Sequence, residues 1–390
     1  MDRRHFIRLA SGGSLAVVAA STSGCAERMP ADAVSAWKGP GNEPDVRRWI
    51  LGYAILAPHS HNLQSWLVDL STPDEIVLSC DLTRTLPETD PTSRQIMMSH
   101  GTFVELLDIA ARERGLRADI SLFPDGEFGP SALDRRAVAR IRLVRDPTVR
   151  KDPLFAQIVK RRTNRSAYDL TRGIPADAWQ AMRGSVAPDA LRFGYVGLDQ
   201  PAVLSRHRVI AAEAWRIEID TPRVMMETYR VLRVGAAEIE RYRDGLYVLD
   251  GIPVLMSRIG LFDRTKAPSP SDYAATSQVK DFNGKLDATP AFLWMVTDGN
   301  DRATQVNAGR AYVRIQLAGT AFGISIHPLQ QALQQALQEY PEQAKPYRDI
   351  RALLEAPQPA QTVQMWARVG FAPAVGPAPR RGVAAQIVRG

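Results

Sequence analysis

Cysteine and long apolar runs are scarce in this chain of 390 residues. Only two cysteines occur, Cys25 and Cys80, and the first lies in a segment that we expect to be removed or acylated. The thiol that remains cannot form an intramolecular disulfide, which excludes a disulfide-stapled secreted domain. Cys80 ends the strand-like run 76–80 and is predicted to be a core residue.

Motifs of several other protein classes are absent as well. The sequence has no Gly-x-Ser-x-Gly elbow of a serine hydrolase and no zinc-ribbon, helix-turn-helix or RNA-binding signature. The net charge of +7 therefore favours small anionic ligands rather than nucleic acid. Hydrophobic and charged fractions of 45% and 23% are those of a globular protein, long enough for one large or two ordinary domains.

The first 25 residues read as an export signal rather than as fold. Arg3 and Arg4 precede a mildly apolar run over 10–20, which is too short to span a bilayer and is typical of twin-arginine signals. Residues 22–25 resemble an imperfect lipobox, with Thr where an aliphatic residue is usual, so Cys25 is a candidate lipid anchor. This interpretation predicts a periplasmic or cell-envelope protein that is exported folded. The alternative is a basic start to the first helix.

Composition and periodicity divide the rest of the chain. Residues 26–44, rich in Ala, Gly and Pro, read as a linker. We expect a first half over 45–150, which begins with a helix capped by Asp45, and a second half over 151–390. In the second half the patterns predict strands over 192–196 and 291–296 and a Gln-rich helix after Pro328. The second half contains a less regular excursion or lid at about 242–283 and a C-terminal extension, 371–390, that ends on a strand-like run.

A weak internal repeat relates the two halves. Setting Gly101 against Gly309 aligns, without a gap, the pairs Leu107 with Ile315, Ala110 with Ala318, and Gly115 with Gly323. In each copy a helix with small residues ends in Gly followed by an aliphatic residue. The match covers one helix only, so coincidence stays open. If the repeat is real, two copies of one α+β unit pack as a dimer within a single chain.

The most concentrated set of candidate ligands lies in five consecutive positions: Arg161, Arg162, Thr163, Asn164 and Arg165. Guanidinium groups offer planar forks of donors that match phosphate oxygens, and the hydroxyl and amide add further hydrogen-bonding groups. The segment is therefore a candidate anion site. The competing interpretation is a solvated basic face.

Together with an upstream loop, this segment resembles the FMN-dependent nitroreductase family, specifically its exported, Acg-like branch with two fused halves. The family's R-R-x-x-R turn is matched by residues 161–165. Its S-S-x-N-x-Q-P-W loop is matched by Pro58, His59, Ser60, Asn62, Gln64 and Trp66. Two positions depart from the family's loop: Ser65 stands where Pro is usual, and His59 stands in place of a Ser.

Two more segments look like the second-half pattern of that family. They supply His327, Pro328, Leu329 and Gln330, which the resemblance places under the flavin ring, and the pair Arg380 and Arg381, which it places near the phosphate. The implied fold is α+β and nitroreductase-like, with two related halves forming an intrachain pseudo-dimer around mixed sheets with long central helices. One FMN is implied, and a monomer that acts as a pseudo-dimer.

The resemblance implies two-electron reduction of a nitroaromatic, a quinone or a similar small acceptor. The flavin carries the redox chemistry, so no catalytic side chain is assigned. The electron donor is NAD(P)H, a quinol or a redox partner. The main alternative is a protein that stores or sequesters FMN with little turnover. A more distant one is a metalloenzyme that uses His59, His61, His100 and His327.

Overall fold

The computed structural model describes residues 27–187, 191–249, 251–333, 340–357 and 359–388. The segment predicted to be an export signal, with Cys25, lies outside the described residues. No described helix combines the length and apolarity that crossing a membrane requires.

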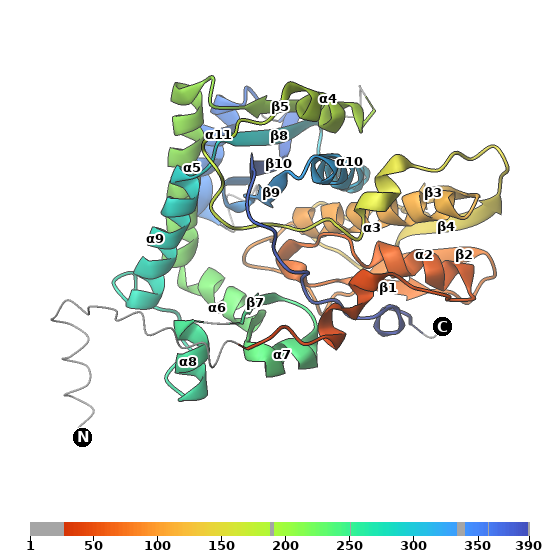
Figure 1. Ribbon diagram of the computed structural model, residues 1–390, viewed down its shortest axis with the longest axis horizontal. Helices are drawn as coiled ribbons and strands as arrows, with labels where there is room; N and C mark the ends of the chain where they lie inside the picture. Colours follow the sequence, from red (N-terminus) through yellow and green to blue (C-terminus); the bar gives the residue numbers. More distant parts are fainter. Residues whose placement is uncertain (1–26, 188–190, 250, 334–339, 358, 389–390) are drawn as a thin grey trace.

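The first half is an antiparallel sheet covered by helices (Figure 1). Its strand order is β1-β2-β4-β3, and the strands are β1 (Trp66–Asp69), β2 (Glu75–Cys80), β3 (Leu116–Leu122) and β4 (Ala137–Arg145). The helices are α2 (Val46–Ala54) and the long α3 (Arg94–Glu113). The predicted helix start at Asp45 is confirmed, because its carboxylate accepts hydrogen bonds from the backbone N–H groups of Arg47 and Arg48.

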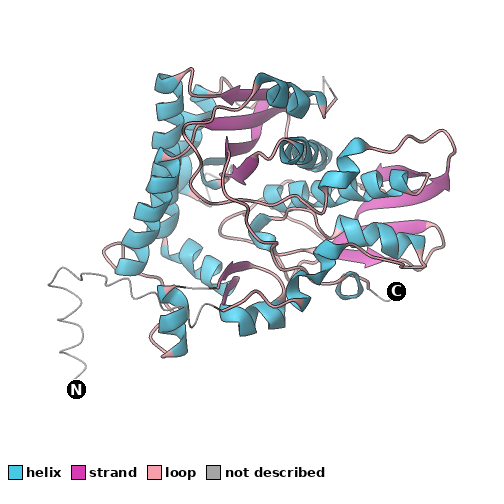
Figure 2. Ribbon diagram, in the orientation of Figure 1, coloured by secondary structure: helices cyan, strands magenta, loops and turns pink. Residues whose placement is uncertain are grey.

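The second half repeats this plan with a sheet of order β5-β8-β10-β9 (Figure 2). The strands are β5 (Arg192–Val196), β8 (Ala291–Asp298), β9 (Ser325–Pro328) and β10 (Gln361–Gly370). The long helix is α10 (Arg302–Ala321), joined by α4 (Ala176–Gly184), α5 (Pro201–Asp220) and α11 (Ala344–Leu353). Much of the Gln-rich helix predicted after Pro328 lies outside the described residues; the short η4 (Gln331–Leu333) precedes them.

The central helices α3 and α10 cross with their backbones in contact, and the contact is reciprocal. A Cβ on Gly101 would lie 1.9 Å from the carbonyl oxygen of Val306, and one on Gly309 would lie 1.9 Å from that of Met98. Under the alignment of Gly101 with Gly309, Met98 corresponds to Val306, so one contact maps onto the other. The predicted α+β fold of two related halves packed as a pseudo-dimer is therefore confirmed.

The C-terminal tail adds a bridge to the sheet of the first half, and the arginine segment adds one to the sheet of the second half. Ile387, near the C-terminus, forms a parallel bridge with Val68 on β1, and Thr163 forms a parallel bridge with Ile326 on β9. These bridges give the otherwise antiparallel four-stranded sheets their mixed character. The tail was predicted to end on a strand over 383–388, but it forms the short η6 (Val383–Ala385) before this single bridge.

The stretch predicted at about 242–283 as a less regular excursion contains β7 (Leu246–Val248), α8 (Ile252–Arg258) and most of α9 (Tyr273–Asp287). Together with the preceding α6 (Pro222–Arg230), β6 (Leu232–Val234) and α7 (Gly235–Tyr242) it forms one segment, called the excursion below, in which β6 and β7 pair as a two-stranded parallel sheet. Gly245 immediately precedes β7, while Pro268 and Pro270 lie in the loop before α9. Gly251 precedes α8 and Pro253 lies in its first turn, where proline is tolerated.

Candidate functional site

The site is built around an aromatic ring that faces three guanidinium groups. Trp37 lies on a short 3₁₀ helix, η1 (Asp32–Lys38), within the segment expected to be a linker, and it is buried. The guanidinium carbons of Arg161, Arg162 and Arg380 lie 5.4, 4.2 and 5.0 Å from the centroid of its ring. The indole N–H donates to the carbonyl of Ala378 at 2.8 Å, which fixes the plane of the ring. Trp37 thus lies against cations from two distant segments.

No described carboxylate lies within ion-pair distance of Arg161, Arg162, Arg165 or Arg380, although nearly thirty such pairs occur elsewhere in the described chain. Burial lowers the pKa of Arg161 to about 10 and that of Arg380 well below its usual value. Cations buried without counter-ions are costly, and their mutual repulsion adds to the cost. The cluster therefore has the electrostatic character of an anion-binding site.

Two of these arginines already hold the backbone of the first half. A terminal nitrogen of Arg161 donates to the carbonyl of Leu56 at 2.9 Å, and one of Arg380 donates to the carbonyl of Ala57 at 3.1 Å. The other terminal nitrogen of Arg380 donates to the side-chain Oδ1 of Asn62 at 2.6 Å. The Nε groups of both arginines are buried and have no hydrogen-bond partner among the described atoms. Each side chain is thus oriented by protein contacts and still has a donor to offer.

The loop after Pro58 has an unusual backbone. His61, Asn62 and Gln64 have φ values of 48°, 56° and 55°, in the left-handed region that costs a non-glycine residue about 1–2 kcal/mol. His59 braces the loop, because its Nδ1 lies 2.8 Å from the carbonyl of Ser60 and its Nε2 accepts the backbone N–H of Ser65 at 3.2 Å. Burial lowers the pKa of His59 to about 3, so the imidazole is neutral.

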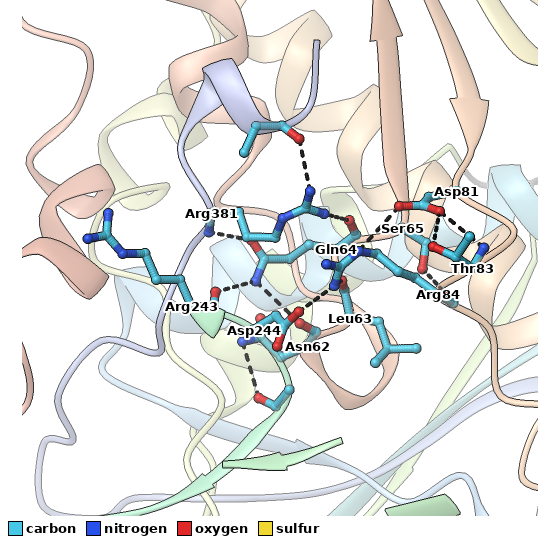
Figure 3. Close-up of polar contacts among 12 residues, drawn as sticks. Asn62, Leu63, Gln64, Ser65, Asp81, Thr83, Arg84, Arg243, Asp244 and Arg381 are labelled. Atoms are coloured by element: carbon cyan, nitrogen blue, oxygen red, sulfur yellow. Dashed lines mark hydrogen bonds and ion pairs between the residues drawn. The ribbon is translucent and has the colours of Figure 1, made fainter. Parts of the chain in front are cut away.

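The two amides of this loop bind protein partners (Figure 3). Asn62 donates to the carbonyls of Gly245 and Pro379, at 3.3 and 3.1 Å. Gln64 donates to the carbonyl of Arg243 at 2.9 Å and accepts the backbone N–H of Arg381 at 2.8 Å. The amides therefore join the loop to the C-terminal basic pair and to the excursion.

A buried carboxylate holds the excursion in this position. Asp244 is ion-paired with Arg84 of the first half, a contact drawn in Figure 3, and with Arg233 of the excursion at 2.7 Å. This contact brings Tyr247 of β7 to the cluster, where the charges of Arg165, Arg380 and Arg162 oppose the burial that raises its pKa. The sequence motifs predicted a role for neither Tyr247 nor Trp37. The one sequence feature that could have indicated Trp37 is the occurrence of a single Trp in a stretch rich in Pro and Gly.

Arg165 projects from the same cluster but remains accessible to solvent. Many protein atoms nevertheless surround the Arg165 side chain. The resulting desolvation lowers the pKa of its guanidinium group. Its charge acts on His61 and His327, whose pKa values burial lowers, to about 4 for His61. The bridge between Thr163 and Ile326 explains this proximity, since it sets the arginine segment beside β9.

Other predicted residues contact protein groups outside the arginine cluster. Asn164 donates to the carbonyl of Pro373 at 2.9 Å and is buried. Leu329 packs in the core of the second half, and Gln330 accepts from Arg94 at 2.8 Å. Pro328 pairs with Ala367 on β10. The structure thus brings the loop, the arginines, Arg380–Arg381 and His327 together, and it directs Leu329 and Gln330 into the interior.

The histidines named in the metal alternative bind other groups. Nδ1 of His100 lies 2.9 Å from the carbonyl of Ile96 within α3, and Nδ1 of His327 accepts from Arg368 at 3.0 Å. Across the described residues, no group of three or more His, Cys, Asp or Glu side chains is arranged to hold a metal ion.

No protein-family model matches this chain. Two proteins of Mycobacterium tuberculosis, from strains CDC 1551 and H37Rv, are each 28% identical to it over 361 residues, which span 88% of this chain and 93% of theirs. Both carry the name "Putative NAD(P)H nitroreductase". Similar solved structures include the FMN-dependent nitroreductase NfnB of Mycobacterium smegmatis in complex with NADPH. That structure is 17% identical, covers 60% of this chain and 96% of its own, and has a TM-score of 0.35.

A nitroreductase with bound FMN from Bacteroides fragilis is 13% identical, covers 60% of this chain and 97% of its own, and has a TM-score of 0.32. The similarity to the two curated mycobacterial proteins extends over nearly the whole chain. It supports the resemblance to nitroreductases that the motifs indicate.

Proposed function

We propose that this protein is an FMN-dependent oxidoreductase that reduces a small acceptor, such as a nitroaromatic or a quinone, by two electrons. The observation that carries the proposal is the set of guanidinium groups of Arg161, Arg162, Arg165 and Arg380, which have no described carboxylate partner and meet where the two halves join. A phosphate monoester supplies the missing negative charge.

The residues present fit this cofactor. Arg161 and Arg380 each retain an unpaired buried Nε–H, and Gln316, which accepts from Arg161 at 3.3 Å, has an unpaired amide nitrogen. These donors suit phosphate and ribityl oxygens. We assign Arg161, Arg162, Arg165 and Arg380 to the phosphate, and the loop 58–64 with His327 to the rest of the cofactor.

When bound, the flavin supplies the redox chemistry, by accepting two electrons from a donor and passing them to the acceptor. The chain's own part is binding and electrostatics. The arginines bind the negatively charged phosphate. The imidazoles of His59 and His61 are neutral at neutral pH, so they add no charge to the site. Arg165 places a further positive charge at the accessible side of the cluster, where it favours the approach of an anion.

One double substitution tests the arginine assignment. Arg161→Ala with Arg165→Ala should give a colourless protein, because two charges that hold the phosphate are lost. The matched control, Arg150→Ala with Arg183→Ala, removes two exposed cations elsewhere and should stay yellow. His61→Ala should also retain flavin. The visible spectrum of each purified chain is the measurement, and full flavin in the first variant would refute the assignment.

Storage of FMN is a second candidate function, and the excursion favours it. Asp244, just before β7, pairs with Arg84 of the first half and with Arg233 of the excursion. These ion pairs hold β7 close to the loop 58–64, and such a contact would slow the release of a bound cofactor. Anaerobic reduction separates the two functions. Bleaching by NADPH or a quinol, followed by reoxidation with a nitroaromatic or a quinone, indicates turnover, whereas a flavin that stays oxidised with every donor indicates storage.

We further propose that the protein works in the cell envelope after folded export. The twin-arginine pattern at Arg3 and Arg4 supports this location. NAD(P)H is scarce there, so a quinol or a redox partner competes with NAD(P)H as donor. Fractionation of cells that express the full chain tests the location, and a purely cytoplasmic protein would contradict it.

A further inference from the structure

Helix α8 exposes a row of large apolar side chains. Ile252, Leu255 and Ile259 follow the spacing of one helical face and are 52, 58 and 55% exposed, while Val254 on another face is 6% exposed and packs inward. Leu261, just beyond the helix, is 47% exposed. Single exposed apolar residues are ordinary, but four on one short segment indicate an interaction surface.

The N-terminal end of the described chain is fastened to this same helix. Glu27 accepts a hydrogen bond from Nε of Arg258 at 3.1 Å and pairs with its terminal nitrogen. It also accepts the backbone N–H of Ala236 at the start of α7. Two residues of chain reach at most about 7 Å, so Cys25, the candidate lipid anchor, is tied to the neighbourhood of α8 whatever its conformation.

The charges around α8 do not oppose contact with a bilayer. Among the described residues, three carboxylates on or beside this segment have cationic partners: Glu27 pairs with Arg258, Glu238 with Arg264, and Asp263 with Lys266 at 3.5 Å. The described part of this surface is therefore apolar, and its paired charges offset one another. Such a surface enters the boundary between headgroups and acyl chains without a buried unpaired charge.

We propose that the stripe formed by Ile252, Leu255, Ile259 and Leu261 docks onto a phospholipid bilayer. Four side chains on a segment of ten residues, 252–261, are few for a stable protein–protein interface, which uses roughly 20–30 residues a side. They suffice for weak, shallow insertion on their own, and a lipid on Cys25 would strengthen it as a second membrane signal. This inference concerns the orientation of the protein on the membrane and does not depend on the flavin.

Vesicle sedimentation tests the proposal with the full chain carrying Cys25→Ser, so that no acyl group contributes. Vesicles of phosphatidylcholine, with and without phosphatidylglycerol, should sediment this parent. Replacing Ile252, Leu255 and Ile259 together with Ser should lower the partition coefficient at least about tenfold, because three inserting side chains are lost. The matched control replaces Leu170, Val209 and Phe322 with Ser, three exposed apolar residues on other elements, and should bind like the parent.

Circular dichroism and the unfolding midpoint verify that both triple variants fold. Equal partitioning of the stripe variant and the parent would overturn the proposal, as would a parent that does not bind vesicles. Sedimentation velocity measures the oligomeric state of the parent. If the parent dimerises through the stripe and does not bind vesicles, the proposal is wrong and the surface binds a second copy of the chain instead.

Discussion

Trp37 shows at the scale of one residue how the cationic site is held together. Its ring faces Arg161, Arg162 and Arg380, which repel one another and have no described carboxylate partner. The negative face of an indole offsets part of that repulsion without occupying the donors that an anion needs. A carboxylate in the same place would pair with the arginines and weaken the binding of a phosphate.

Substitutions of Trp37 should separate packing from electrostatics. Trp37→Ala removes both the buried ring and the cation–π contacts, so we expect a loss of about 3–5 kcal/mol in unfolding free energy and at least about tenfold weaker FMN binding. Trp37→Phe keeps an aromatic face and should bind FMN within about threefold of the parent. Fluorescence titration of the apo proteins with FMN, beside urea unfolding, measures both. Equal FMN affinity in all three proteins would remove Trp37 from the site.

The left-handed residues His61, Asn62 and Gln64 illustrate what motif matching leaves out. The motif indicated which amides belong to the loop, and it assigned them to the cofactor. In the structure these amides bind Pro379, Gly245, Arg243 and the backbone of Arg381. Their partners come from segments some 180 to 320 residues away, so no local pattern could reveal them.

At the scale of elements, the excursion from α6 to α9 is part of the site because one carboxylate holds it there. Asp244 is 2% exposed in its side chain and pairs with Arg84 and Arg233. Removing one partner of a buried ion pair leaves an uncompensated charge, which destabilises more than the pair itself stabilises.

Asp244→Asn should therefore lower the unfolding free energy by about 3 kcal/mol and speed the release of bound flavin. Glu240→Gln is the matched control, since it breaks the exposed pair with Arg243 on the same excursion and should cost less than about 1 kcal/mol. Flavin release after dilution, followed by fluorescence, and thermal unfolding are the measurements. Release at the parental rate from Asp244→Asn would show that the excursion does not retain the cofactor.

The close crossing of the central helices α3 and α10 depends on glycine at the contact. Gly101→Ala places a methyl group 1.9 Å from a backbone oxygen of α10, so the helices must separate, and we expect a loss of about 3 kcal/mol or more. Gly284→Ala on α9 meets nothing within 4 Å and should be neutral or stabilising by up to about 1 kcal/mol. Urea unfolding compares them. A fully stable Gly101→Ala protein would contradict the close crossing of the helices.

For the whole molecule, the sequence was sufficient to predict the plan of two related halves. The alignment of Gly101 with Gly309 predicted a repeat that the reciprocal helix contact confirms. Periodicity located α2, β5 and β8 because their apolar faces follow simple patterns. It underestimated the order of the excursion, where Gly251 and Pro253 begin a helix rather than interrupt one.

The remaining part of the site could not be predicted because it arises from long-range packing. Trp37 and Tyr247 reach the arginines only once η1 and β7 have docked, and neither segment carries a motif. Leu329 and Gln330 follow His327 in the chain, but they lie beyond the end of β9, where Leu329 packs in the core of the second half and Gln330 accepts from Arg94 of the first half. Adjacency in a motif therefore did not guarantee adjacency in the site.

The stoichiometry of FMN binding tests the central claim most directly. The claim places one flavin between the first-half loop and the arginines, so calorimetric titration of the apo chain with FMN should give one site per chain. The same titration of Arg161→Ala with Arg165→Ala should show at least about a hundredfold weaker binding, through loss of two charge-assisted contacts. No binding by the parent, or one site of unchanged affinity in the double variant, would contradict the account.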